Sequence, residues 1–300
     1  TDGGGSIRIP SAFCGLVGLK PTNGAIGRWP TPDWIDYSTE GPMANSAQDL
    51  RLLASVMFGP VAGDPSAPVA LSRQSDDPTL FTKIIAMYRT SDLGAVSPQM
   101  ASLLDDAVSS LTSILNTQIT WREPGTLFGS HDPDLDWFVV APAEHLVSLG
   151  RDFVTAGLPN MHPSSQEFFT AALEVSIDDY IEARRRRFDY IGIVDDLLGN
   201  DGLLVTCTNG MEGWLADGKL SADESLLPPA AYNTALFNIT GNPVLNLPFG
   251  FLPNGLPFGF QVVAPHFRDA DLLHIAQLWQ QAHPWPTVAS GYEPFASDLG

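Results

Sequence analysis

The chain has little charge, few cysteines and no long hydrophobic run, and each absence narrows its function. Charged residues make up 16% of the 300 residues, with 15 basic against 34 acidic, so the net charge is −19. A charge of this sign repels the phosphates of nucleic acids and anionic lipids, so we expect neither as a partner of this part of the protein. No apolar run approaches the roughly 18 residues of a membrane-spanning helix.

Two cysteines, Cys14 and Cys207, are too few for the disulfide framework of a small secreted protein. We expect both thiols to be free and buried in a cytoplasmic protein, with one disulfide between them as the alternative. No pair of histidines or cysteines has the spacing of zinc ligands, so we expect no metal site and no cofactor.

The residues that are present predict an α/β fold. Hydrophobic residues make up 44% of the chain, a globular value, and helical repeats alternate with short apolar segments typical of buried strands. We expect a mixed sheet covered by helices. The predicted helices span residues 46–57, 97–115, 143–153, 176–198, 230–239 and 268–282, and the predicted strands span residues 13–19, 83–89, 203–206, 244–247 and 259–263.

The chemically informative segment is a run of three glycines, Gly3, Gly4 and Gly5, that ends in Ser6. Glycines allow a tight turn whose successive N–H groups point at one place and can hold an anion. A serine beside such a turn is typical of a nucleophile next to an oxyanion hole. The alternative is a plain glycine turn with a solvated serine. A phosphate-binding loop fits less well, because no G-K-[ST] sequence follows.

The motif continues into a longer resemblance. The run G-G-S-I-R-I-P followed by S-A-F-C-G-L-V-G-L-K-P-T, residues 4–22, closely resembles the core of the amidase signature family. Residues 237–243, 247–250 and 255–261 are similar to the closing segments of that family. The middle of the chain matches weakly.

The resemblance implies a single amidase-signature-like domain over residues 1–300. Residues 60–200 would then form a helix-rich, variable region that faces the substrate. The family's serine falls on Ser6, which implies hydrolysis of a carboxylic amide through an acyl-enzyme. The backbone N–H groups of Gly3, Gly4, Gly5 and Ser6 would hold the developing oxyanion, and no cofactor is implied.

The family also uses a lysine and a second serine in a cis peptide to accept the proton of the nucleophile. Both lie upstream of the glycine motif in the family, and none of Lys20, Lys83 and Lys219 stands in the catalytic position. We therefore expect a C-terminal portion of a longer amidase-like protein, with the N-terminal part of the fold missing and no activity alone. Two further departures are Gly3, where a larger residue is more frequent, and Thr206, where proline is usual.

Charged residues near the motif have simpler interpretations. Asp2 and Arg8 flank the glycines and are expected to pair and brace the loop. A serine–histidine–acid triad on Ser6 with one of the six histidines is a weaker alternative. The four arginines at 184–187 have acidic neighbours and predict solvated ion pairs within their own helix rather than a nucleic-acid site. The phenylalanines that alternate over residues 249–251 and 258–260 are expected in the core.

Three functions remain open from the sequence. The first is an amidase acting on a small-molecule amide whose identity and binding residues the sequence does not define, with a homodimer as one assembly left open. The second is the glutamine-hydrolysing subunit of a tRNA-dependent amidotransferase, which belongs to the same family. The third is a non-catalytic binding protein that kept the amidase fold.

Overall fold

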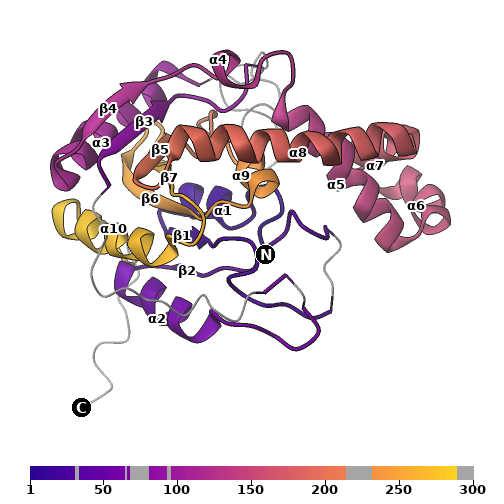
Figure 1. The fold of residues 1–300 in the computed structure, drawn as a ribbon, viewed down its shortest axis with the longest axis horizontal. Helices are drawn as coiled ribbons and strands as arrows, with labels where there is room; N and C mark the ends of the chain where they lie inside the picture. Colours follow the sequence, from indigo (N-terminus) through magenta and orange to yellow (C-terminus); the bar gives the residue numbers. More distant parts are fainter. Residues whose placement is uncertain (31–33, 65, 68–80, 93–95, 214–231, 289–300) are drawn as a thin grey trace.

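The computed structural model describes residues 1–30, 34–64, 66–67, 81–92, 96–213 and 232–288, which form one mixed sheet with helices on both faces (Figure 1). The strands are β1 (Val17–Lys20), β2 (Met43–Ala44), β3 (Lys83–Met87), β4 (Gln118–Trp121), β5 (Gly202–Cys207), β6 (Val244–Phe251) and β7 (Pro257–Val263). Their order across the sheet is β2-β1-β6-β7-β5-β3-β4. β3 pairs in parallel with β4 and β5, and the other pairs are antiparallel. The predicted α/β class with a mixed sheet is confirmed.

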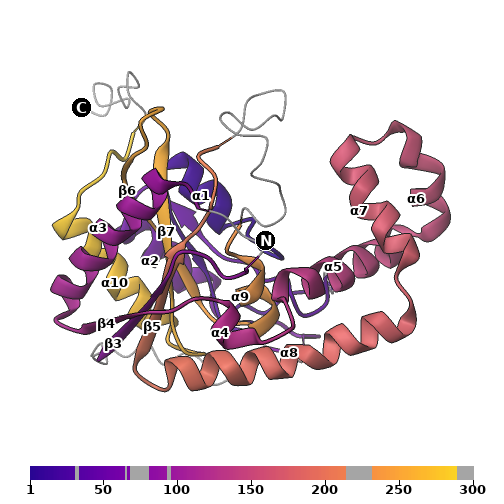
Figure 2. The same cartoon turned by 90° about the horizontal axis from the view of Figure 1, so that it is seen from above.

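The helices divide between the two faces of the sheet. They are α1 (Arg8–Cys14), α2 (Ala47–Met57), α3 (Pro98–Leu115), α4 (Gly125–Phe128), α5 (Pro133–Leu149), α6 (Arg151–Gly157), α7 (Pro163–Glu174), α8 (Ile177–Leu198), α9 (Ala235–Thr240) and α10 (Asp269–Ala282). α2, α3 and α10 share one apolar core with the strands, and α5, α8 and α9 share a second. α6 and α7 project away from the sheet (Figure 2).

The alternation of side chains along the strands makes the two faces chemically different. On β7, Phe258 and Phe260 belong to the apolar core under α2, α3 and α10. The intervening positions, Gly259 and Gln261, point to the face that α1 covers. A Cβ on Gly259 would lie 2.6 Å from the Cβ of Ala12 on α1, so glycine is what allows the helix to approach the sheet. α1 therefore rests on small and polar positions.

Local start signals correctly located α3 and α8. The hydroxyl of Ser97 accepts the Met100 N–H at 3.2 Å at the start of α3. Ser176 and Asp179 form both hydrogen bonds of a capping box at the start of α8. Each side chain satisfies an N–H group that the first turn of a helix leaves without a partner.

The strand expected at residues 13–19 is wrong in its first half. α1 continues to Cys14, and Gly15 ends it with a φ of +65° before β1 begins at Val17. The apolar run spans the end of a helix and the start of a strand, and composition does not separate the two. Cys14 is exposed, contrary to expectation, whereas Cys207 is buried; both thiols are free.

The helix expected at residues 143–153 is also misplaced. α5 begins ten residues earlier because Asp132 caps it, accepting the Asp134 N–H at 2.9 Å. It ends at Leu149, where Gly150 has a φ of +93°. The helix expected at 230–239 is observed as α9, and residues 230 and 231 lie outside the described part. Phe251 is expected in the core, but it lies at the end of β6 with 57% of its surface exposed, so this prediction is wrong.

The arginines of α8 form their shortest ion pairs with other elements, and the expected pairing within their own helix is present as one longer contact, 3.7 Å between Arg186 and Glu182. Arg186 binds Asp136 of α5 through Nε at 2.8 Å and Nη2 at 2.6 Å. Arg187 Nη1 binds Asp36 at 3.0 Å, and Arg184 also contacts this carboxylate. These contacts hold α8 against α5 and the segment before β2.

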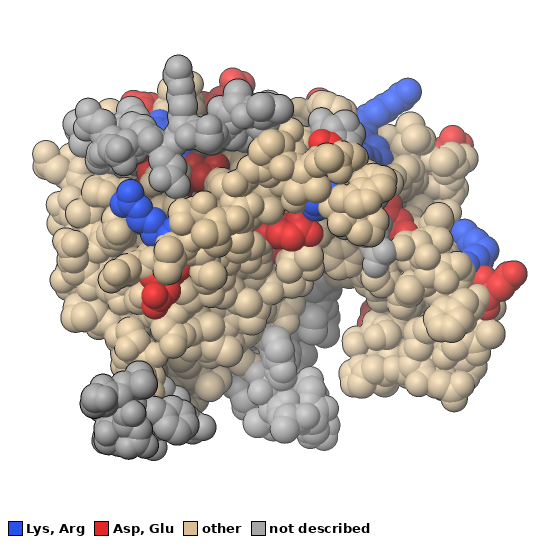
Figure 3. All heavy atoms as spheres, turned by 90° about the horizontal axis from the view of Figure 1, so that it is seen from below, with Lys and Arg blue, Asp and Glu red and all other residues tan. Residues whose placement is uncertain are grey.

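Figure 3 shows isolated acidic and basic side chains scattered over a mostly uncharged face. None of the helices in the described ranges combines the length and hydropathy needed to cross a bilayer.

Candidate active site

The glycine-rich loop before α1 places Ser6 at the surface. Gly3 and Gly5 are buried, Gly4 is half-buried and Ser6 is exposed. Gly5 has a φ of +131°, and a Cβ there would lie 2.5 Å from the hydroxyl oxygen of Thr234. Both constraints favour glycine, so the backbone path of the loop dictates its composition.

The carboxylate of Asp2 closes the loop. Its Oδ1 accepts the Gly5 N–H at 2.8 Å, and its Oδ2 accepts the Ile7 N–H at 3.1 Å. A carboxylate at the start of a helix satisfies N–H groups that have no helical partner and interacts favourably with the helix dipole. Because Asp2 engages the Gly5 N–H, the predicted oxyanion donors that stay open to a ligand are those of Gly3, Gly4 and Ser6.

Arg8 binds the same carboxylate, as predicted. Its Nη2 lies 2.8 Å from Oδ1 of Asp2 and its Nε lies 3.0 Å from Oδ2, and both side chains are fully buried. Burial alone would raise the pKa of Asp2. The charge and hydrogen bonds of Arg8, with a hydrogen bond from Asn238, outweigh it and hold this pKa well below its ordinary range.

Asn238 of α9, which the sequence did not single out as a site residue, completes this network. Its Oδ1 accepts Arg8 Nη2 at 2.6 Å, and its Nδ2 donates to Oδ1 of Asp2 at 2.8 Å and to the Tyr37 carbonyl at 3.0 Å. The side chain is fully buried. A lone amide inside an apolar helix is a usable signal, because buried amides are hydrogen-bonded.

Two carbonyls of the loop are held by side chains from distant parts of the chain. The indole Nε1 of Trp137 on α5 donates to the Gly3 carbonyl at 2.8 Å. The hydroxyl of Thr234 donates to the Gly4 carbonyl. Neither donor was predicted, because both come from segments that share no motif with the loop.

The two flanking carbonyls are held by backbone groups. The Asp2 carbonyl accepts the Thr39 N–H at 3.0 Å, and the Gly5 carbonyl accepts the Ile9 N–H at 2.7 Å. Every carbonyl from Asp2 to Gly5 therefore has a donor, and the orientation of each following peptide N–H is defined.

The N–H groups of Gly3, Gly4 and Ser6 have no acceptor among the described residues. In a planar trans peptide the N–H points opposite to the C=O. With the carbonyls anchored, these three donors are held in place without a partner. They belong to the same loop as Ser6, whose side chain is exposed.

Trp34 and Trp137 pack against the glycines. A Cβ on Gly3 would lie 1.7 Å from Cε3 of Trp34, and a Cβ on Gly4 would lie 2.6 Å from Cζ2 of Trp137. The two indoles meet edge to face with their centroids 5.8 Å apart. Trp34 thus accounts for glycine at a position where the family more often has a larger residue.

No hydrogen bond joins Ser6 to a histidine or a lysine in the described part of the chain. His266 lies 3.3 Å from Asp195, and His283 hydrogen-bonds to Ser110. The triad alternative gains no support from these contacts. No group of histidine, cysteine, aspartate or glutamate side chains in the described ranges could hold a metal ion.

Lys20 is fully buried on β1, and its Nζ donates to the Pro21 carbonyl at 2.9 Å. Burial, and then the charge of Arg8, lower its pKa to about 7. Lys83 is half-buried at the start of β3, and Lys219 lies outside the described residues.

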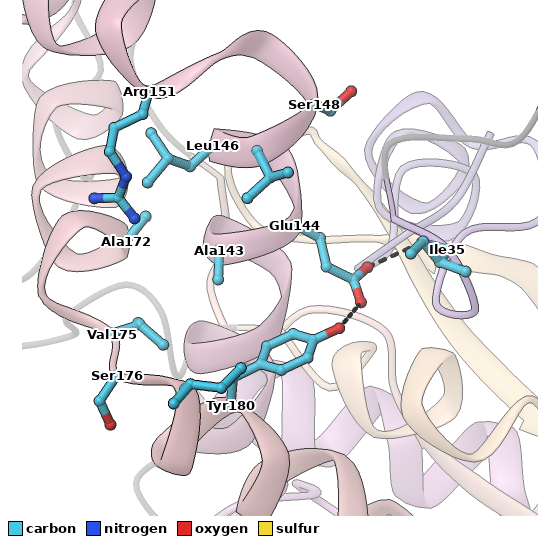
Figure 4. A pocket seen from close by; sticks show the side chains of 12 residues that line it. Ile35, Ala143, Glu144, Leu146, Ser148, Arg151, Ala172, Val175, Ser176 and Tyr180 are labelled. Atoms are coloured by element: carbon cyan, nitrogen blue, oxygen red, sulfur yellow. Dashed lines mark hydrogen bonds between the residues drawn. The ribbon is translucent and has the colours of Figure 1, made fainter.

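A cavity of about 550 Å³ lies between α5, α6, α7 and α8 (Figure 4). Glu144 in its wall accepts the hydroxyl of Tyr180 at 2.8 Å and the Ile35 N–H at 2.9 Å. Because Ile35 follows Trp34 in the chain, Glu144 also holds the segment that packs on Gly3. The cavity is lined by Ile35, Ala143, Glu144, Leu146, Val147, Ser148, Arg151, Ala172, Val175, Ser176, Ile177 and Tyr180.

Fold and loop together define a class of α/β proteins in which an exposed serine follows an anchored glycine turn in front of a helix. A family model described as Amidase matches residues 1–190, more than half of the chain. The chain belongs to the amidase signature family.

Particular relatives agree with this assignment. The chain is 30% identical to a glutamyl-tRNA(Gln) amidotransferase subunit from Azotobacter vinelandii, over 95% of this chain and 63% of that protein. It superposes on a 6-aminohexanoate cyclic dimer hydrolase with a TM-score of 0.75 and 25% identity, covering 95% of this chain and 64% of the other. A bacterial aryl acylamidase shares the fold, with a TM-score of 0.75 and 18% identity over 94% of this chain and 61% of the other. The chain thus spans less than two thirds of the length of these proteins.

Proposed function

We propose that this chain carries the nucleophile and the oxyanion site of an amidase that acts on a small-molecule amide. The observation behind the proposal is the exposed Ser6 beside three backbone N–H groups that have no acceptor among the described residues. Membership of the amidase family supports the same reaction. A cytoplasmic location and a homodimer stay predictions.

The proposed reaction has two halves. Oγ of Ser6 attacks the amide carbonyl carbon, and the N–H groups of Gly3, Gly4 and Ser6 stabilise the negative oxygen. The proton of Ser6 passes through a general base to the nitrogen as the C–N bond breaks, which releases ammonia or an amine. Water then attacks the ester, releases the acid and restores Ser6. The resemblance implies a lysine and a cis-peptide serine as the base, and none of Lys20, Lys83 and Lys219 stands in that lysine's position.

The test is turnover by the full-length protein on a panel of aromatic, aliphatic and amino-acid amides. We expect Ser6→Ala to lower turnover by about 10⁴-fold or more, the scale of losing a nucleophile. Ser55→Ala, which removes an exposed hydroxyl on α2, is the matched control and keeps turnover. Retained turnover in Ser6→Ala rejects the proposal. Mass spectrometry after treatment with a serine-directed phosphonofluoridate provides a second readout, an adduct on the peptide that contains Ser6.

A second candidate is the glutamine-hydrolysing subunit of a tRNA-dependent amidotransferase. The relative that is 30% identical to this chain supports it. Ammonia released from glutamine only in the presence of partner subunits favours this function, whereas hydrolysis of simple amides without partners favours a free amidase. If the full-length protein shows no turnover and forms no phosphonofluoridate adduct, the non-catalytic binding protein is favoured.

A further inference from the structure

The peptide between Gly3 and Gly4 differs from the other peptides of the loop in how it is anchored. Three peptides present an N–H without an acceptor among the described residues. In two of them the carbonyl is held by a backbone N–H, in the bridge from Asp2 to Thr39 and at the start of α1. In the third, the only donor to the Gly3 carbonyl among the described residues is the indole N–H of Trp137, at 2.8 Å.

Because the two ends of a trans peptide point in opposite directions, the bond to the Gly3 carbonyl also determines where the Gly4 N–H points. We propose that Trp137 is a positioning residue that aims the Gly4 N–H into the oxyanion site beside Ser6. This inference rests on the proposed amidase function. Trp137 itself does not touch the reacting atoms and acts through the peptide plane.

The surroundings of Trp137 suit a fixed donor. Its ring meets Trp34 and Phe138 edge to face, with centroids 5.8 Å and 5.0 Å away. The preceding residue, Asp136, holds α5 to α8 through two hydrogen bonds from Arg186. A rigid donor costs little reorganisation when charge develops on the substrate, which is the basis of oxyanion stabilisation.

The neighbouring peptide between Gly4 and Gly5 provides a contrast. Its carbonyl is held by Thr234 and its N–H by Asp2, so both ends are engaged within the protein. Loosening this peptide frees no oxyanion donor. The positioning role therefore falls on Trp137 and not on every residue that contacts the loop.

The experiment compares Trp137→Phe with Trp285→Phe in the full-length protein, using the best amide of the panel. Trp137→Phe keeps an aromatic ring on Gly4 but removes the donor, and we expect kcat to fall by about 10- to 100-fold with little change in KM. Trp285→Phe also removes an indole N–H that holds a backbone carbonyl, that of Asn45 at 2.8 Å, outside the glycine loop. We expect this control to lower kcat by less than threefold.

A second measurement separates positioning from a general loss of structure. The aldehyde analogue of the best amide adds to Oγ of Ser6 and places a negative oxygen in the site, whereas the corresponding carboxylic acid binds without forming that bond. We expect Trp137→Phe to weaken binding of the aldehyde by about the same factor by which kcat falls. Binding of the acid should weaken by less than threefold. A kcat within twofold of wild type, or an equal weakening of both ligands, overturns the inference. Absence of turnover in the wild type, or its persistence in Ser6→Ala, instead rejects the proposed function.

Discussion

The indole ring of Trp34 occupies the space in which a side chain of residue 3 would lie. A Cβ on Gly3 would come within 1.7 Å of Cε3 of Trp34, which is far inside van der Waals contact. The two residues are therefore coupled, since glycine at position 3 is what admits tryptophan at position 34. Ile35, hydrogen-bonded to Glu144, keeps the ring in that place.

Gly3→Ala tests this coupling. The added methyl group must displace Trp34, and we expect a loss of about 1–3 kcal/mol in the free energy of unfolding, measured with urea. In the double variant Gly3→Ala with Trp34→Ala, the methyl group has room. The cost of Gly3→Ala should then fall by more than half. A cost that is the same with and without Trp34 would mean that the two positions are independent.

The control for Gly3→Ala is Gly192→Ala on α8. No atom lies within 4 Å of a Cβ built there, apart from its chain neighbours and its own helix backbone. Alanine has a higher helix propensity than glycine, so the free energy of unfolding of this variant should rise by up to about 1 kcal/mol. If Gly3→Ala lowers the free energy of unfolding and Gly192→Ala raises it, the loss at Gly3 is caused by Trp34 and not by the general effect of replacing glycine.

Asp2→Asn should be strongly destabilising. It leaves the guanidinium of Arg8 buried without its counter-charge, and breaking a buried pair in this way costs about 3–5 kcal/mol. The measurement is urea unfolding at neutral pH. Asp92→Asn is the control, because Asp92 lies 3.6 Å from Arg89 and its side chain is 54% exposed; it should cost less than about 1 kcal/mol. Similar costs for the two variants would contradict the role given to the Asp2–Arg8 pair.

Asp136→Asn should weaken the contact between α5 and α8. The carboxylate accepts Arg186 Nε at 2.8 Å and the Tyr190 hydroxyl at 2.7 Å, and its side chain is 8% exposed. Both of these bonds go to Oδ2, while Nη2 of Arg186 binds Oδ1 at 2.6 Å. An amide has one acceptor oxygen and carries no charge, so we expect a loss of about 2–3 kcal/mol in the free energy of unfolding, measured with heat or urea. Glu182→Gln changes a second partner of Arg186, one that is 3.7 Å away and 67% exposed, and should be nearly neutral.

The sequence predicted those parts of the structure that depend on neighbours in the chain. The capping box of Ser176 and Asp179 located α8, and the G-G-S motif located the loop and its pair of Asp2 and Arg8. Contacts over long separations were missed for a physical reason. Trp137 and Asn238 reach the loop only because α5 and α9 pack against it, and no local pattern encodes that packing.

Errors in the elements have an equally local cause. The run over residues 13–19 is apolar throughout, yet it contains the last two residues of α1 and the first three residues of β1. Gly15, with a φ of +65°, separates the two elements. A glycine among apolar residues is compatible with a strand or with the end of a helix, and only the packing of α1 on Gly18 and Gly259 selects the second.

Lys20→Met should change stability in a pH-dependent way. Burial, followed by the charge of Arg8, lowers the pKa of Lys20 to about 7 from an ordinary value of 10.5. Between these values the unfolded chain binds more protons than the folded one, so Lys20 makes stability rise with pH. Its unfavourable contribution is full below about pH 7 and fades towards pH 10. In urea unfolding, the free energy of unfolding of the variant should therefore exceed that of the wild type by more at pH 6 than at pH 9. Lys83→Met, at the half-buried lysine of β3, controls for the loss of a lysine, and an equal gain from Lys20→Met at both pH values would contradict the assignment.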